Sequence, residues 1–175
     1  DSGFISGGIV SIIFGILFFL SNMDHDKKLS LHQAFLLTSL SWISVAVFGS
    51  LPFIFSSMEL SFTDALFESM SGITTTGSTI ITDLDSAPKG ILFWRAMLQW
   101  LGGIGIIIMA ITLMPIMNVG GMQLFKISSN DTDEKILPKS KEISLRLILI
   151  YLGLTIICSI FYKIFGMSFF DSITH

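Results

Sequence analysis

Long uncharged stretches alternate with short charged ones along this chain. Asp, Glu, Lys and Arg are absent from four stretches rich in apolar residues, which are residues 2–23, 31–58, 96–125 and 147–162. A helix needs about 20 apolar residues to cross the hydrocarbon core of a membrane. The pattern therefore predicts an all-α integral membrane protein, with spans over residues 1–23, 31–55, 94–117 and about 147–162.

A segment between the second and third spans is too short to cross a membrane. Residues 63–71 are predicted to form a short helix, for which Thr63 or Asp64 is a suitable N-cap. The sequence GITTTGST follows at residues 72–79. Its β-branched threonines disfavour a helix, so we expect the run that begins at Ser71 to be extended.

Extended backbone at membrane depth is tolerated only where protein buries it or where it lines a water-filled path. Residues 72–79 are therefore predicted to be a filter, in a loop that enters and leaves the membrane on one side. Stacked carbonyl oxygens can replace the hydration shell of K⁺. The alternative for these residues alone is a Thr/Gly turn that joins two helices.

Composition agrees with a membrane protein. Hydrophobic residues make up 51% of the chain, charged residues only 13%, and the mean hydropathy is +0.78. The single cysteine, Cys158, excludes an intrachain disulfide, and the spans hold neither a metal-ligand cluster nor an acid–base pair. We expect no enzyme activity, no organic cofactor and no binding of nucleic acid.

The basic residues fix the expected orientation. Seven of the ten fall on one side of the predicted topology: Lys27, Lys28, Lys126, Lys135, Lys139, Lys141 and Arg146. Basic loops stay in the cytoplasm. Residues 126–142 are therefore predicted to form the main cytoplasmic loop, and Asp83 and Asp85 to lie outside, where they either attract cations to the mouth or belong to a solvated loop.

The end of the chain repeats an earlier pattern. SFFDSITH at residues 168–175 shares its serine, its first phenylalanine and its aspartate with SFTDALFE, 107 residues before it. Both copies follow an apolar span and open a short helix. We interpret residues 31–125 as a complete repeat of span, pore helix, filter and span, and residues 143–175 as the truncated start of a second repeat.

Three ordered motifs resemble the TrkH family of potassium-uptake subunits, in the Trk/Ktr/HKT superfamily. They are FESMSGITTTGST at residues 67–79, LFWRAMLQWLGGIGII at residues 92–107 and VGGMQL at residues 119–124. The resemblance implies four such repeats around one pore in the bacterial inner membrane, with this chain as an N-terminal fragment. Residues 1–23 would then be a helix that precedes the first repeat.

The resemblance also implies which residues meet the ion. Backbone carbonyls of Thr75 and Thr76, with Thr74 and Gly77 beside them, would supply one quarter of a K⁺ site. Relatives that admit Na⁺ can carry serine at the position of Gly77, so glycine favours K⁺. We expect Glu68 to hydrogen-bond the back of the filter or to pair with Arg95, both as supporting residues.

The leading hypothesis for function is therefore K⁺ uptake, with K⁺ as the transported ion. The resemblance implies contact with membrane lipid, a homodimer and a cytosolic nucleotide-binding regulatory subunit of the Trk type. The alternatives are a non-conducting membrane scaffold of the same fold, and a pore with Na⁺ permeability. Ion flux separates the first alternative from transport.

Overall fold

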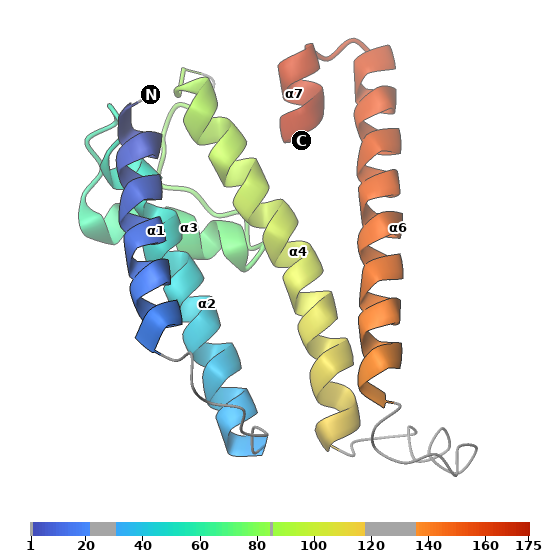
Figure 1. The fold of residues 1–175 in the computed structure, drawn as a ribbon. Helices are drawn as coiled ribbons and strands as arrows, with labels where there is room; N and C mark the ends of the chain where they lie inside the picture. The colour runs from blue at the N-terminus through green and yellow to red at the C-terminus, as the bar shows by residue number, and fades with distance from the viewer. Residues whose placement is uncertain (1, 22–30, 85, 118–135) are drawn as a thin grey trace. The chain divides into compact units, whose positions relative to one another are not determined.

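The computed structural model describes residues 2–21, 31–84, 86–117 and 136–175, and all regular structure among them is helical (Figure 1). The helices are α1 (Ser2–Ser21), α2 (Leu31–Ile54), α3 (Phe62–Ile73), α4 (Lys89–Met117), α6 (Ile136–Ile164) and α7 (Phe169–Thr174). Four of them are long and apolar enough to cross a membrane, over Gly3–Ser21, Phe35–Ile54, Lys89–Ala110 and Glu142–Ile164. The predicted all-helical membrane fold is confirmed.

The chain divides into two compact units, Asp1–Gly103 and Ile104–His175. In the first unit α1 and α2 pack antiparallel, with Gly3 and Gly7 of α1 at the contact. A Cβ at Gly3 would lie 2.4 Å from the carbonyl oxygen of Phe55, and one at Gly7 would lie 3.3 Å from Leu51 Cβ. Small residues permit such close approach in a membrane, where packing drives helix association.

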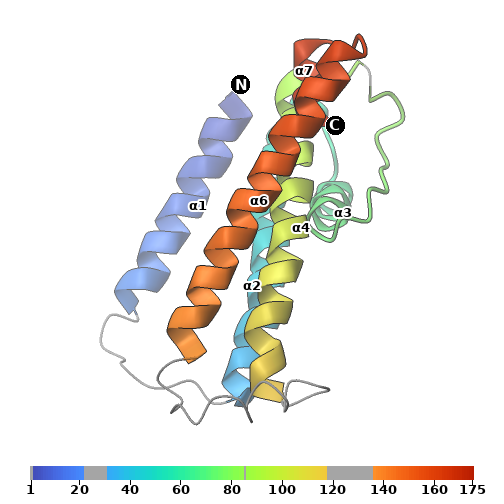
Figure 2. The same ribbon diagram turned by 90° about the vertical axis from the view of Figure 1, so that its right-hand side faces the viewer.

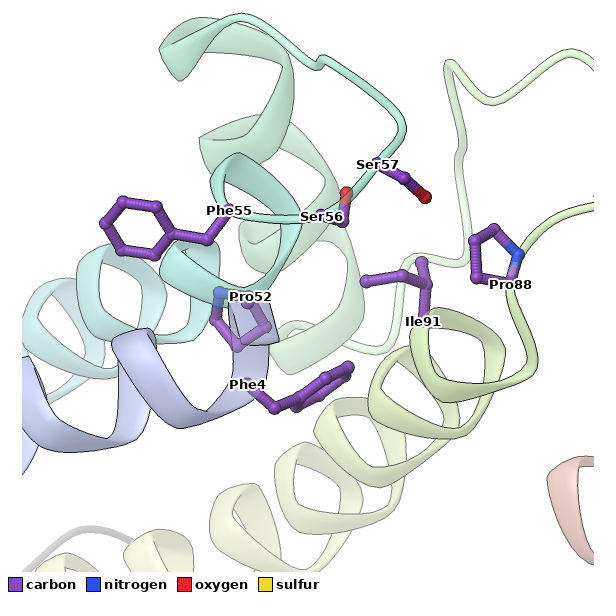
Figure 3. Close-up of a pocket in the computed structure, with 8 residues that line it drawn as sticks. Phe4, Pro52, Phe55, Ser56, Ser57, Pro88 and Ile91 are labelled. Carbon is purple, nitrogen blue, oxygen red and sulfur yellow. The ribbon is translucent and has the colours of Figure 1, made fainter. Parts of the chain in front are cut away.

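The two ends of the segment between α2 and α4 lie close together. A cavity of about 100 Å³ is lined by Phe4 from α1, by Pro52 of α2 with Phe55, Ser56 and Ser57 just after its end, and by Pro88 and Ile91 at the start of α4 (Figure 3). The chain between them descends, forms α3 and returns. Figure 1 shows α3 lying across α2, and Figure 2 shows α3 nearly end-on. The chain therefore enters and leaves this loop on one side of the first unit, as the predicted pore loop requires.

The short helix differs from its prediction at both ends. Ser61, rather than Thr63 or Asp64, is the N-cap, and its hydroxyl accepts a hydrogen bond from the Asp64 N–H at 3.2 Å. The helix continues to Ile73, so Ser71–Ile73 are helical and buried rather than extended. Packing overrides the local preference here, because Gly72 lies against Leu98 of α4.

Other boundaries also differ. Helix α2 ends at Ile54 rather than at residue 55, and α4 begins at Lys89, before the predicted start at residue 94. Residues 136–142, predicted to belong to the cytoplasmic loop, are the first residues of α6. The rest of that loop, the VGGMQL motif, Asp85, and Lys27 and Lys28 lie outside the described residues.

The second unit ends in a helix–turn–helix. Gly166 has a φ of +102°, which glycine adopts without strain, and it turns the chain from α6 into α7. Ser168 caps α7 by accepting a hydrogen bond from the Asp171 N–H at 3.1 Å. The turn into α7 therefore has the same cap as the turn into α3.

Candidate pore-loop site

The segment after α3 directs its N–H groups back to the helix. The N–H groups of Thr74 and Thr75 donate to the carbonyls of Met70 and Gly72, both at 3.0 Å. Those of Thr76 and Gly77 donate to Ser71 O at 3.1 Å and 3.4 Å. These bonds satisfy carbonyls that a helix otherwise leaves unpaired at its C-terminus.

The carbonyl groups of Thr74–Thr76, unlike their N–H groups, have no partner in α3. No described residue donates a hydrogen bond to the carbonyl oxygens of Thr74, Thr75 or Thr76, and all three residues are exposed. A backbone carbonyl is an obligatory acceptor that needs water, a donor or a cation. The run is therefore a row of acceptors with no protein donor in the described part of the chain.

Two residues of this segment have positive φ. Thr75 has a φ of +58° and Gly77 a φ of +77°. The first is unusual, because a β-branched residue is strained in the left-handed region. The second lies where glycine is favoured. Strain at Thr75 is maintained by the hydrogen bonds that hold its neighbours to α3.

The threonine side chains bond within the segment. Thr74 Oγ1 donates to Met70 O at 2.7 Å and lies 2.8 Å from Thr76 Oγ1. Since the Thr74 proton is used by Met70, Thr76 is the donor in the contact between the two hydroxyls. Both side chains therefore brace the backbone at the end of α3.

Glu68 lies fully buried behind this segment. Its Oε1 accepts hydrogen bonds from Thr79 Oγ1 and from the Ile80 N–H, each at 2.6 Å, and its Oε2 accepts from Arg95 Nε at 2.8 Å. Glu68 therefore bonds the return segment of the loop through Oε1 and pairs with Arg95 through Oε2. A buried carboxylate without such partners would be costly.

Arg95 joins the pair to the loop. Its Nη2 donates to the carbonyl oxygens of Gly77 at 3.1 Å and Ser78 at 3.3 Å. Ser78 O also accepts from Ser71 Oγ at 2.5 Å. The structure thus gives the Gly77 carbonyl a protein donor, in contrast to the carbonyls of Thr74–Thr76.

Three residues of this network carried no individual role in the sequence prediction: Ser71, Ser78 and Thr79. They lay within the run of hydroxyl residues, but sequence alone did not show which of these residues bond to one another, to Glu68 or to Arg95 behind the loop.

Helix α4 packs closely against the end of α3. A Cβ at Gly102 would lie 2.0 Å from the carbonyl oxygen of Ile73, immediately before the threonines. Trp94 Nε1 donates to Gly49 O of α2 at 2.9 Å. Helix α4 therefore fixes the loop after α3 through both packing and Arg95.

Comparison with known proteins agrees with this architecture. The TrkH family model, described as a cation transport protein, matches residues 1–171. The Trk system potassium uptake proteins TrkI of Halomonas elongata and TrkH of Vibrio parahaemolyticus are 44% and 41% identical to the chain over 82% and 98% of its length. The chain spans 29% and 36% of these two relatives, about a third of their length.

A solved structure shows the same similarity to the TrkH family. The crystal structure of the potassium transporter TrkH from Vibrio parahaemolyticus superimposes with a TM-score of 0.85 and 38% sequence identity. The match covers 99% of this chain and 34% of that protein. The chain belongs to the TrkH family of cation transport proteins, which are multi-pass membrane transporters and not enzymes.

Proposed function

We propose that this chain provides one quarter of the selectivity filter of a transporter that takes up K⁺ across the bacterial inner membrane. The relatives are named potassium uptake proteins, and the chain spans about a third of their length. The observation that carries the proposal is the direction of the backbone in Thr74–Gly77. Every N–H points back to α3, which leaves the carbonyls of Thr74–Thr76 for the ion.

Thr75 and Thr76 supply the main carbonyls in this proposal, with Thr74 and Gly77 beside them. A dehydrated K⁺ needs several oxygen ligands in place of its water. The Gly77 carbonyl already accepts from Arg95, so the ion would use its second lone pair. Gly77 acts chiefly through its φ of +77°, which lets the backbone turn toward Arg95.

A whole filter needs further copies of this loop, and the second unit supports a repeat. Glu59 and Gly166, 107 residues apart, both have positive φ before a short helix. Two residues later, Ser61 and Ser168 form caps with closely similar backbone angles. We propose that residues 143–175 begin a second pore repeat. We also propose that the complete transporter is a homodimer regulated by a cytosolic nucleotide-binding subunit of the Trk type.

The decisive experiment replaces Gly77 by serine in a complete transporter that contains this chain. Serine strains the backbone at positive φ, at a cost of roughly 1–3 kcal/mol. We expect K⁺ uptake by K⁺-depleted cells to fall. The ratio of ⁴²K⁺ uptake to ²²Na⁺ uptake should drop about tenfold. Gly8→Ser is the matched control, because no atom lies within 4 Å of a Cβ built there.

Four outcomes separate the possibilities. Loss of selectivity in Gly77→Ser but not in Gly8→Ser supports the filter. Unchanged selectivity in Gly77→Ser refutes the role of Thr74–Gly77. A complete wild-type transporter without ion flux indicates a membrane scaffold, and one that admits Na⁺ as readily as K⁺ indicates an unselective pore.

A further inference from the structure

The hydroxyl of Thr79 lies on the protein side of the pore loop. It donates to Glu68 Oε1 at 2.6 Å and accepts from the Ile81 N–H at 3.1 Å. Its proton and one of its lone pairs are thus both used within the protein. Thr79 lies in the stretch predicted as filter, but its side chain bonds to a buried carboxylate behind that stretch.

The bond from Thr79 fixes the rotation of the Glu68 carboxylate. Oε1 receives two donors, Thr79 Oγ1 and the Ile80 N–H, so the carboxylate plane cannot turn without breaking both. Oε2 then points to Arg95 Nε at 2.8 Å. Since Glu68 is fully buried, water cannot replace a lost donor at low cost.

The orientation of Glu68 in turn fixes Arg95. The guanidinium group is planar, so a bond at Nε also determines where Nη2 lies. Nη2 donates to the carbonyls of Gly77 and Ser78, at the end of the proposed coordinating run. The contacts thus form one continuous path from the Thr79 hydroxyl to the Gly77 backbone.

We infer that Thr79 is a positioning residue for cation selectivity, which acts through Glu68 and Arg95 without contacting the ion. The inference rests on the proposed function of Thr74–Gly77. Removal of the hydroxyl frees the Glu68 carboxylate to turn and releases Arg95 from the Gly77 carbonyl. The coordinating oxygens then lose the fixed spacing that distinguishes K⁺ from Na⁺.

The test compares Thr79→Val with Thr79→Ser in the complete transporter. Valine keeps the shape of threonine and removes the hydroxyl, whereas serine keeps the hydroxyl and removes the methyl group. We expect Thr79→Val to lower the K⁺/Na⁺ uptake ratio about tenfold, the factor expected for one lost hydrogen bond to a charged group. Thr79→Ser should keep a ratio close to that of the wild type.

Thr82→Val is the matched control, because Thr82 is exposed on the same return segment and lies outside the proposed filter. It should leave the uptake ratio unchanged. The amount of each variant recovered from the membrane reports folding. If Thr79→Val is not recovered, Thr79→Ser against Thr79→Ala makes the same comparison between side chains of small size.

The outcomes are distinct from those of the proposed function. Equal uptake ratios in the variants with and without a hydroxyl at position 79 overturn the inference, even where Gly77→Ser still abolishes selectivity. A Thr79→Ser variant as impaired as Thr79→Val also overturns it, because packing of the methyl group would then matter instead. Loss restricted to the variants without a hydroxyl supports it.

Discussion

At the scale of single residues, burial distinguishes two ion pairs of similar geometry. Arg95 Nε and Glu68 Oε2 are 2.8 Å apart, and the exposed fractions of the two side chains are 13% and 0%. Arg146 Nη2 and Glu142 Oε1 are 2.6 Å apart, but those side chains are 74% and 61% exposed. Solvent screens the second pair, so the shorter distance does not make it the stronger one.

Replacing Glu68 tests this difference. Glu68→Ala leaves Arg95 without its carboxylate and the Ile80 N–H without its acceptor. Removal of one partner of a buried pair costs about 3 kcal/mol in the free energy of unfolding. Thermal unfolding of the complete transporter in detergent should show a clear decrease in melting temperature.

Glu142→Ala provides the comparison, since it breaks the exposed pair with Arg146. The melting temperature of this variant should match that of the wild type. A decrease of equal size in Glu68→Ala and Glu142→Ala would show that burial does not make the pair of Glu68 and Arg95 the stronger one.

At the scale of helices, α4 determines where the end of α3 can lie. The carbonyl of Ile73 occupies the space that a side chain at Gly102 would need. Gly72 lies against Leu98. Both contacts fall within a few residues of Thr74. The position of the threonine carbonyls therefore depends on the absence of a Cβ at Gly102 of α4.

Gly102→Ala should push α4 away from α3, because the added Cβ would lie 2.0 Å from backbone oxygen. A backbone atom cannot move aside as a side chain does, and overpacking of this kind costs roughly 1–3 kcal/mol. We expect both the melting temperature and K⁺ uptake to fall. Gly8→Ala, which adds a Cβ in open space, should change neither, and normal uptake by Gly102→Ala would contradict the close packing.

At the scale of the whole molecule, exposed apolar side chains cover the long helices. In α6, for example, Leu149, Ile156 and Phe161 are all more than half exposed. Such a surface requires lipid or further helices around it. The basic residues then give the expected orientation, with the return segment of the pore loop outside the cell.

Thiol labelling tests this orientation. In a background with Cys158→Ser, a membrane-impermeant maleimide added to intact cells should label Ser86→Cys in the return segment. It should label Lys28→Cys only after the cells are made permeable. Labelling of Lys28→Cys in intact cells would reverse the predicted topology.

The spans and the short helix could be predicted from sequence because each depends on a local pattern of charge and apolar residues. Pairing of Glu68 with Arg95 was among the expectations, but the contacts of Ser71, Ser78 and Thr79 behind the loop could not be predicted, because only the return of the chain brings these residues to their partners. The helical state of Ser71–Ile73 also depends on α4, whose glycine-rich face allows the close approach. Roles for Ser71 and Thr79 required these tertiary contacts.

The direction of the backbone after α3 has a consequence for chloride. An anion would need N–H or O–H donors in place of its water, and the N–H groups of Thr74–Gly77 all point into α3. The hydroxyl protons of Thr74 and Thr76 are used as well. The backbone of this stretch therefore presents only its carbonyl oxygens, the negative ends of its dipoles, so in the proposed filter it would disfavour anions before the size of any cation is compared.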